Sequence, residues 1–241
     1  MKLISIPLIT ILTILLVEQA HASPKVTQAA LINFKVNDVT VLAVEELGKS
    51  PALLVLKGNE IIYSAQFGEH FVATEEFAYT NSFLRFKSFN IEGLLSPILL
   101  AVAAAPGGSD EGFEIKIISE KDGKITLLNP DPIFITIQEG IFLGYISSKY
   151  GHGMITWNFQ WDAAHYGPYK YEICIYRWDR KNQKFSLIEK LITMKKFKDG
   201  CSALKYYGLP CKNYRDEVIK VGEDISTLGI EVELLRPKAK P

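Results

Sequence analysis

The fold of this chain is decided by the stretch Met154-Ile155-Thr156-Trp157-Asn158-Phe159-Gln160-Trp161. Apolar and polar side chains alternate along it, and successive side chains of a β-strand point to opposite faces of the sheet. Ile155, Trp157 and Phe159 therefore share one face, whereas Thr156 and Asn158 share the other. Such alternation is typical of a half-buried strand in an antiparallel sheet, and it predicts that Trp157 and Phe159 pack in the core.

The chain on either side of this stretch repeats the strand pattern at short intervals. The strongest neighbouring strand is expected at residues 169–178, and Gly58-Asn59 and Asp122-Gly123 are dipeptides typical of hairpin turns. Further strands are expected at residues 40–44, 52–57, 60–66, 77–89, 113–119, 124–128, 133–137, 141–146, 185–194 and 230–235.

Residues 97–105 form an apolar run that begins at a proline. Its length fits a strand that is buried on both faces, although its alanines leave a helix as the alternative. Helices are expected only late in the chain, at residues 202–207 and from a cap at Asn213 through Lys220. The sequence therefore predicts a mainly β protein of antiparallel sheets, as a sandwich or a propeller-like array, with one or two short helices near the C-terminus.

The first residues carry the pattern of a secretory signal peptide. Lys2 supplies a positive charge, residues 3–17 are nearly all apolar, and Ala20-His21-Ala22 has the small residues that a signal peptidase accepts. We expect cleavage before Ser23, because the apolar run is shorter than the ~20 residues of a membrane span. An uncleaved N-terminal anchor is the alternative. The pattern predicts a soluble protein that is secreted or periplasmic.

The chain is accordingly divided into a signal peptide at residues 1–22, a single mainly β domain at residues 23–235 and a disordered tail at residues 236–241. Residues 23–28 are polar and are expected to form a loose leader into the domain. No later segment is apolar enough to be a transmembrane span.

The charges of the chain disfavour one class of partner. It has 27 basic and 27 acidic residues, and removal of the signal peptide takes one of each. A neutral chain lacks the positive field that drives nucleic-acid binding, so nucleic acid is excluded as an expected partner.

The three cysteines are Cys174, Cys201 and Cys211. Export would place them where disulfides persist, and the short loop between Cys201 and Cys211 makes these two the expected pair. Cys174 lies in a strand-like run and is expected to be a buried thiol, because free cysteine behaves as a small hydrophobic residue.

Two segments resemble a known repeat. Residues 89–102, with Asn90, Glu92 and Gly93, look like the loop-then-strand unit of FG-GAP/VCBS-type repeats, and residues 176–187 are similar to the strand-turn-strand that closes such a unit. The resemblance implies a secreted, propeller-like protein, and some members of this family inhibit cell-wall hydrolases. Asn90 and Glu92 stand where the family has calcium-binding aspartates, so no metal is expected here.

The binding residues that the sequence predicts are aromatic. Trp161, His165, Tyr166 and Tyr169 lie close to a turn and are expected to be exposed, where they could stack on a sugar or pack against a protein. Aromatic side chains are over-represented among the residues that dominate binding interfaces. We therefore expect a binding or inhibitor-like β module that contacts a protein or a glycan through this aromatic loop.

Two other functions stay open. Asp162 and His165 could form a carboxylate-oriented base in an extracytoplasmic hydrolase, and a structural, envelope-associated role needs no site. No Gly-x-Ser-x-Gly, His-Glu-x-x-His or phosphate-binding glycine loop occurs in the chain. The histidines lack zinc-like spacing, so neither a metal nor a cofactor is expected. The sequence therefore favours a binding protein over an enzyme.

Overall fold

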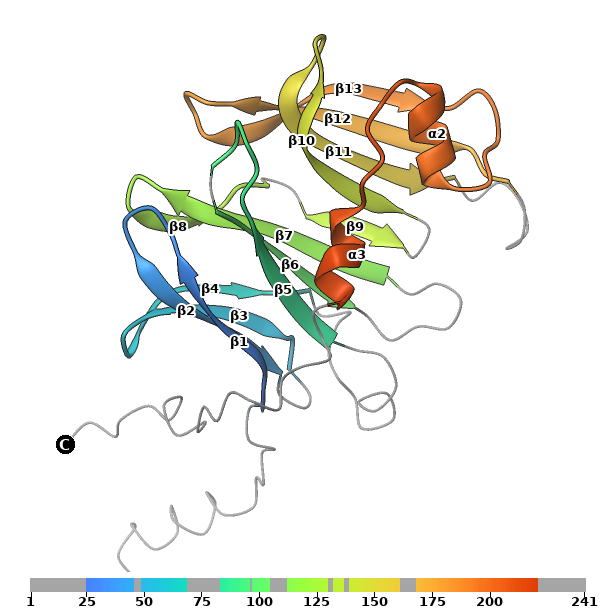
Figure 1. Cartoon of the computed structure of the whole chain (residues 1–241). Coiled ribbons are helices and arrows are strands. Elements are labelled where there is room, and N and C mark those ends of the chain that lie inside the picture. The colour runs from blue at the N-terminus through green and yellow to red at the C-terminus, as the bar shows by residue number, and fades with distance from the viewer. Residues whose placement is uncertain are drawn as a thin grey trace, which may run out of the picture.

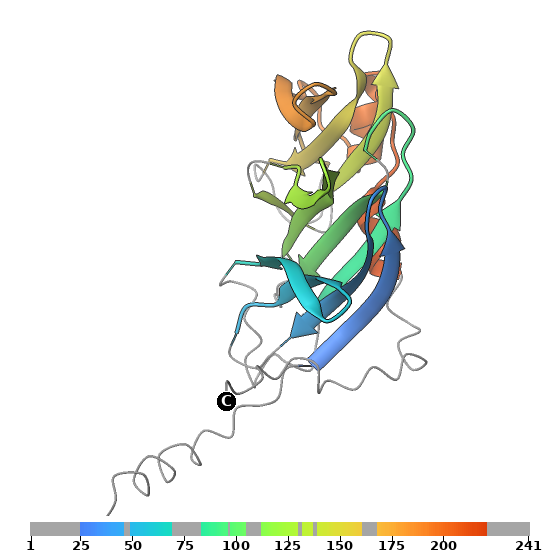
Figure 2. The same ribbon diagram turned by 90° about the vertical axis from the view of Figure 1, so that its left-hand side faces the viewer.

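The computed structural model describes residues 25–45, 49–68, 83–95, 97–104, 112–129, 132–136, 139–160 and 168–220. These residues form three antiparallel sheets and two short helices, which confirms the predicted mainly β class. Figure 1 shows the sheets one above another, in chain order from blue to orange, and Figure 2 shows the same stack from the side.

Each sheet is built from strands that are consecutive in the sequence. The N-terminal sheet contains β1 (Lys25–Asn33), β2 (Asp38–Glu45), β3 (Ala52–Lys57) and β4 (Glu60–Gln66). The central sheet contains β5 (Phe83–Phe89), β6 (Ile98–Ala104), β7 (Gly112–Lys121) and β8 (Lys124–Leu127), and β9 (Ile133–Thr136) also pairs with β7. The C-terminal sheet contains β10 (Gly140–Ser147), β11 (Gly151–Phe159), β12 (Tyr171–Asp179) and β13 (Lys184–Ile192).

Strand β6 lies at the centre of this stack and is buried along its whole length. Its side chains alternate between two clusters. Leu99, Ala101 and Ala103 pack in the cluster shared with the N-terminal sheet. On the other face, Leu100 and Val102 belong to the cluster shared with the C-terminal sheet and the helices. Within the run at residues 97–105, Ile98–Ala104 form the predicted strand with two buried faces, and the alternative helix is wrong.

Several turns and strands lie where the sequence placed them. Gly58-Asn59 joins β3 to β4, and Asp122-Gly123 joins β7 to β8. Gly58 and Gly123 both have positive φ, which a glycine adopts without the strain of a side chain. Trp157 and Phe159 are 4% and 6% exposed, which confirms that they belong to the core.

The expected loose leader at residues 23–28 is wrong for residues 25–28, which begin β1. This strand pairs with β2 in antiparallel register, and Thr27 is 8% exposed. Polar side chains at 27 and 28 concealed the strand, because they do not alternate with apolar residues. The side chain of Gln28 instead donates to and accepts from the backbone of Phe86, at 2.8 and 2.9 Å.

This contact satisfies backbone hydrogen-bonding groups at the free edge of the central sheet. Strand β5 is the outermost strand of that sheet, so one row of its backbone groups has no strand partner. Gln28 bonds both the N–H and the carbonyl of Phe86, and a carboxylate oxygen of Glu45 accepts the N–H of Leu84 at 2.7 Å. Buried backbone groups without partners are costly. Side chains of the N-terminal sheet therefore take the place of a missing strand.

Acidic side chains of β7 also join the first two sheets. Glu114 is 3% exposed, contacts Lys116 at 2.6 Å and accepts the backbone N–H of Gly68 at 2.7 Å. Glu120 accepts the backbone N–H groups of Val36 and Asn37 at 3.1 and 3.2 Å. Each carboxylate is thus satisfied across the interface, as a buried charge requires.

Two helices complete the described chain. α2 (Gly200–Tyr206) packs on β11 and β12, and α3 (Tyr214–Ile219) lies between the central and C-terminal sheets, in contact with β5, β6 and β10. The predicted cap is confirmed, because the side chain of Asn213 accepts the N–H of Arg215. The same oxygen accepts the N–H of Ile141, which ties the start of α3 to β10.

Cys201 and Cys211 lie at disulfide distance, with Cα atoms 5.2 Å apart. This is the pair that the sequence predicted, and it joins α2 to the segment that leads into α3. Cys174 has no disulfide partner and is partly exposed on β12, so it is less buried than expected.

Other expectations lie outside the described residues. These are the signal peptide at 1–22, the final strand at 230–235 and the disordered tail at 236–241. Within the described ranges, no helix is both long and apolar enough to cross a membrane.

Truncation of β6 tests whether both of its faces are buried. Leu99→Ala and Leu100→Ala point to opposite faces, and both residues are 0% exposed. Each variant should lose roughly 2–5 kcal/mol of unfolding free energy in urea denaturation, because each leaves a cavity. Leu127→Ala on β8 is the control, since Leu127 is 39% exposed and should cost less than about 1 kcal/mol. A small loss at either β6 position would contradict the stacked arrangement.

The cysteine pair predicts the oxidation state of the protein. The intact mass should be lower by the two hydrogens that one disulfide removes, and peptide mapping should link Cys201 to Cys211. Reduction should lower the free energy of unfolding by about 3 kcal/mol, because a short loop is released in the unfolded chain. Detection of free thiols at both positions would contradict the pairing.

Candidate functional site

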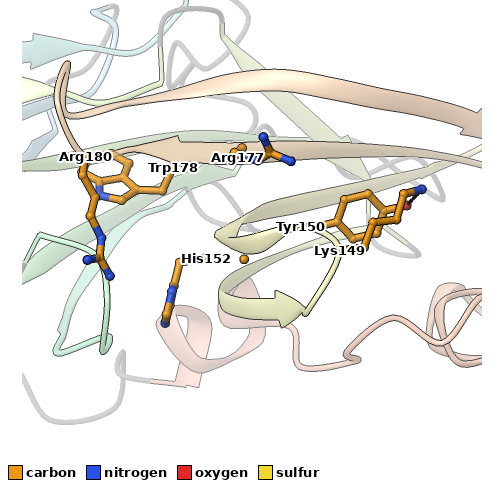
Figure 3. Close-up of a pocket in the computed structure, with 7 residues that line it drawn as sticks. Lys149, Tyr150, His152, Arg177, Trp178 and Arg180 are labelled. Carbon is orange, nitrogen blue, oxygen red and sulfur yellow. Dashed lines mark hydrogen bonds between the residues drawn. The ribbon is translucent and has the colours of Figure 1, made fainter.

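A pocket of about 320 Å³ lies at one end of the C-terminal sheet. It is formed where the β10–β11 hairpin tip meets the ends of β11 and β12. Figure 3 shows Lys149 and Tyr150 side by side at one end, Trp178 and Arg180 at the other, and His152 and Arg177 between them. The residues that line the pocket are Lys149, Tyr150, Gly151, His152, Arg177, Trp178 and Arg180.

Two glycines allow the backbone to build this pocket. Gly151 has φ +72° and completes the hairpin turn that places Tyr150 and His152 on either side of it. Gly93, with φ +79°, lies in the loop between β5 and β6, and a Cβ there would stand 2.3 Å from Nε2 of His152. The loop of the central sheet therefore packs directly against His152, and only a glycine permits this approach.

One end of the pocket is a closed network of hydrogen bonds. Nζ of Lys149 lies 2.9 Å from a carboxylate oxygen of Glu189 and 2.6 Å from the hydroxyl of Tyr150, which donates to the same carboxylate. The hydrogen bonds from Lys149 and Tyr150 hold the pKa of Glu189 below its usual range. The hydrogen bonds to Tyr150 and then to Glu189 raise the pKa of Lys149. The charge of Lys149 is thus balanced within the protein.

The rest of the pocket carries positive charge without such a balance. Arg177 and Arg180 are exposed, and neither pairs with a carboxylate among the described residues. Asp179 lies between them in sequence, but its carboxylate accepts the backbone N–H groups of Lys181 and Asn182. These hydrogen bonds, first those of Asn182, lower the pKa of Asp179. The geometry therefore leaves two guanidinium groups available to a ligand.

Part of the pocket wall is aromatic. Trp178 is 7% exposed and packs on Phe185, with ring centroids 4.9 Å apart. The imidazole of His152 meets the ring of Tyr145 edge to face at 5.4 Å. Tyr145 is 55% exposed and does not itself line the pocket. The pocket thus combines packed aromatic side chains with the exposed side chains of Arg177 and Arg180.

Of the residues that the sequence predicted for binding, the structure describes only Tyr169. Trp161, His165 and Tyr166, together with Asp162, lie outside the described residues. Tyr169 was expected to be exposed, and that expectation is wrong: it is 2% exposed. Its backbone pairs with that of Phe197 and its ring lies 4.9 Å from that of Phe159, so the side chain points into the core.

The cationic pocket was missed by the sequence reasoning. Lysine and arginine near turns are ordinary surface residues, so Lys149, Arg177 and Arg180 carried no signal of their own. The structure places Gly93 against the imidazole of His152, and His152 and Trp178 both line the pocket.

A buried carboxylate occupies the opposite end of the same sheet. One oxygen of Glu139 accepts the N–H of Phe159 at 2.9 Å, and the other accepts the N–H of Thr136. Glu139 thus joins β9 of the central sheet to β11 of the C-terminal sheet. Burial raises its pKa from 4.5 to about 7, although both backbone hydrogen bonds and the charge of Arg215 act in the other direction.

Comparisons with models of protein families, with curated proteins and with solved structures find no match to this chain. Among the described residues, no three His, Cys, Asp or Glu side chains gather as a metal site would require.

The pKa of Glu139 predicts how stability depends on pH. The unfolded carboxyl loses its proton near pH 4.5 and the folded one near pH 7, so proton release favours the unfolded chain. The unfolding free energy should fall by up to ~3 kcal/mol between these pH values. Glu139→Gln, which cannot ionise, should lack this decrease in denaturation curves measured at several pH values.

Glu189→Gln is the matched control, because the pKa of Glu189 is shifted downward rather than upward. The unfolding free energy of this variant should still decrease between pH 4.5 and 7. If Glu139→Gln follows the same pH dependence as the native chain, Glu139 is not the group responsible.

Proposed function

We propose that this protein is an exported binding protein, and that the pocket between Lys149 and Arg180 contacts a protein or a glycan. The observation that carries the proposal is a pocket of about 320 Å³ lined by Trp178 and by two arginines. These arginines, Arg177 and Arg180, pair with no carboxylate among the described residues. Sites for small groups typically have such dimensions and combine apolar walls with a few polar groups.

The shape of the pocket supports recognition rather than catalysis. It is lined by cations, tyrosine, tryptophan and one histidine, and its lining contains no carboxylate or other acid. Hydrolysis by general acid and base needs a group that takes a proton close to the reacting atoms. The candidates in the lining are already engaged, because Gly93 packs against Nε2 of His152 and Glu189 holds both Lys149 and the Tyr150 hydroxyl. The lining therefore suits the positioning of a ligand.

Export is supported by two independent observations. The sequence at residues 1–22 has the three regions of a signal peptide. Cys201 and Cys211 lie at disulfide distance, and such pairs persist mainly outside the cytoplasm. We infer that the mature chain begins at Ser23 and acts in the periplasm or outside the cell.

We propose the aromatic loop predicted from the sequence as a second contact surface of the protein. It connects Phe159 of β11 to the start of β12, and Phe159 pairs with Tyr171. The pocket lies at the other end of these strands, where Gly153 pairs with Arg177. The two surfaces begin at opposite ends of the sheet, so substitutions can test them separately.

A hydrolase that uses Asp162 and His165 is the second candidate function. The observation that favours it is Glu139, a carboxyl group with a pKa of about 7 that bonds Phe159 just before this loop. A carboxyl group titrating near neutral pH is suited to proton transfer. Both oxygens of Glu139 already hold backbone N–H groups, however, and this favours a structural role.

Affinity capture tests the proposed function. The chain from residue 23 onward is immobilised, exposed to culture fluid and envelope extract, and compared with Arg177→Gln/Arg180→Gln and Trp161→Ala/Tyr166→Ala. Lys181→Gln/Lys184→Gln removes the same charge from exposed residues beside the pocket and is the matched control. The partner or glycan should be lost at least tenfold from the pocket variant and retained by the control.

Each outcome of this capture experiment has a distinct meaning. Loss only from the Trp161/Tyr166 variant would place the contact on the aromatic loop and contradict the pocket. Identical capture by all variants would contradict both surfaces. If nothing is captured by the native chain, the binding function is wrong and a structural, envelope-associated role is favoured.

A further inference from the structure

We infer that the pocket recognises an acidic polysaccharide, a sugar chain that carries carboxylate or sulfate groups. This inference rests on the proposed binding function and names the chemical class of its ligand. It follows from the charge, the size and the lining of the pocket.

The charge of the pocket selects an anion. The chain as a whole is neutral, yet Arg177 and Arg180 both line the pocket without acidic partners in the described part of the chain. A guanidinium group binds a planar or tetrahedral oxyanion through two parallel N–H donors, which gives direction as well as attraction. Lys149 adds a third cation at the far end, but Glu189 already balances it. An anionic group is therefore expected nearer the arginines.

The extent of the positive surface argues against nucleic acid. A nucleic-acid site presents a stripe of lysine and arginine that follows many phosphates. Here two arginines without acidic partners line one open hollow of about 320 Å³, and the exposed Lys181 and Lys184 beside it do not belong to its lining. Such a hollow accepts one acidic unit, while the rest of a flexible chain continues over the surface on either side. This is the geometry that a polysaccharide with spaced charges requires.

The lining also suits a sugar ring. Tyr150 lines the pocket and is partly exposed, and the C–H face of a sugar packs well on an aromatic ring. His152 also lines the pocket and makes no hydrogen bond within the described residues, so it adds a polar ring to this surface. A peptide carboxylate would use the arginines equally well, so poly-glutamate is the polymer that separates the two classes of ligand.

Calorimetric titration at low salt with defined polymers tests the inference. The polymers are polygalacturonate for carboxylates, dextran sulfate for sulfates, uncharged dextran, poly-glutamate and a DNA duplex. Polygalacturonate or dextran sulfate should bind, with an affinity that falls as salt screens the charges, and dextran should not bind. Whichever acidic polymer binds more tightly identifies the group that the arginines prefer.

Variants connect this binding to the pocket. Arg177→Gln/Arg180→Gln should weaken binding of the acidic polysaccharide at least tenfold, because charged hydrogen bonds are lost. Lys181→Gln/Lys184→Gln removes the same charge and should change the affinity no more than about twofold, because these exposed side chains do not line the pocket. Denaturation midpoints of both variants should match the native chain, since neither pair is buried.

The inference is overturned if neither acidic polysaccharide binds, if both variants weaken binding equally, or if DNA or poly-glutamate binds as tightly. These failures differ from failure of the proposed function. Capture that depends on Arg177 and Arg180, without affinity for acidic polysaccharides, would retain the binding function and reject only the ligand class. Absence of any pocket-dependent capture, together with absence of polymer binding, would reject both.

Discussion

The structure depends on the burial of strand β6 on both faces. A strand of Ile, Leu, Val and Ala with 0–1% exposure at every position needs a sheet above it and a sheet below it. Burial of apolar surface contributes about 25 cal/mol per Å², so one uncovered face would leave much of this strand unstabilised. The N-terminal and C-terminal sheets are the two covers, and their packing on β6 fixes the order of the stack.

Apolar contact alone would not set how the sheets are oriented, and buried polar groups supply that specificity. Gln28 and Glu45 bond the free edge of β5, and Glu120 bonds the backbone before β2. Glu139 does the same between β9 and β11. Each of these side chains reaches from one sheet to the backbone of another, and a displaced sheet would leave its carboxylate or amide buried without partners. That cost is several times the gain from any single contact.

The same stacking positions the candidate site. Gly93 belongs to a loop of the central sheet, whereas His152 and Trp178 belong to the C-terminal sheet, and the approach of the two sheets brings that loop against the imidazole. The pocket therefore has a rigid aromatic side, held by sheet packing, and two exposed arginines that can adjust to a ligand. A site built in this way loses little conformational freedom on its aromatic side when it binds.

The sequence by itself determined the local features whose cause is local. The Gly58-Asn59 turn, the Asn213 cap and the two-faced strand β6 were all predicted, because turn chemistry, capping and hydrophobic pattern act over a few residues. Strand β1 and the burial of Tyr169 were not, because Gln28 and Tyr169 obtain their partners from segments distant in sequence. The cationic pocket was the feature least predictable from the sequence. Lys149 and Arg180 look like any exposed residues along the chain, and only the tertiary structure, by pairing β11 with β12, decided that they line one hollow.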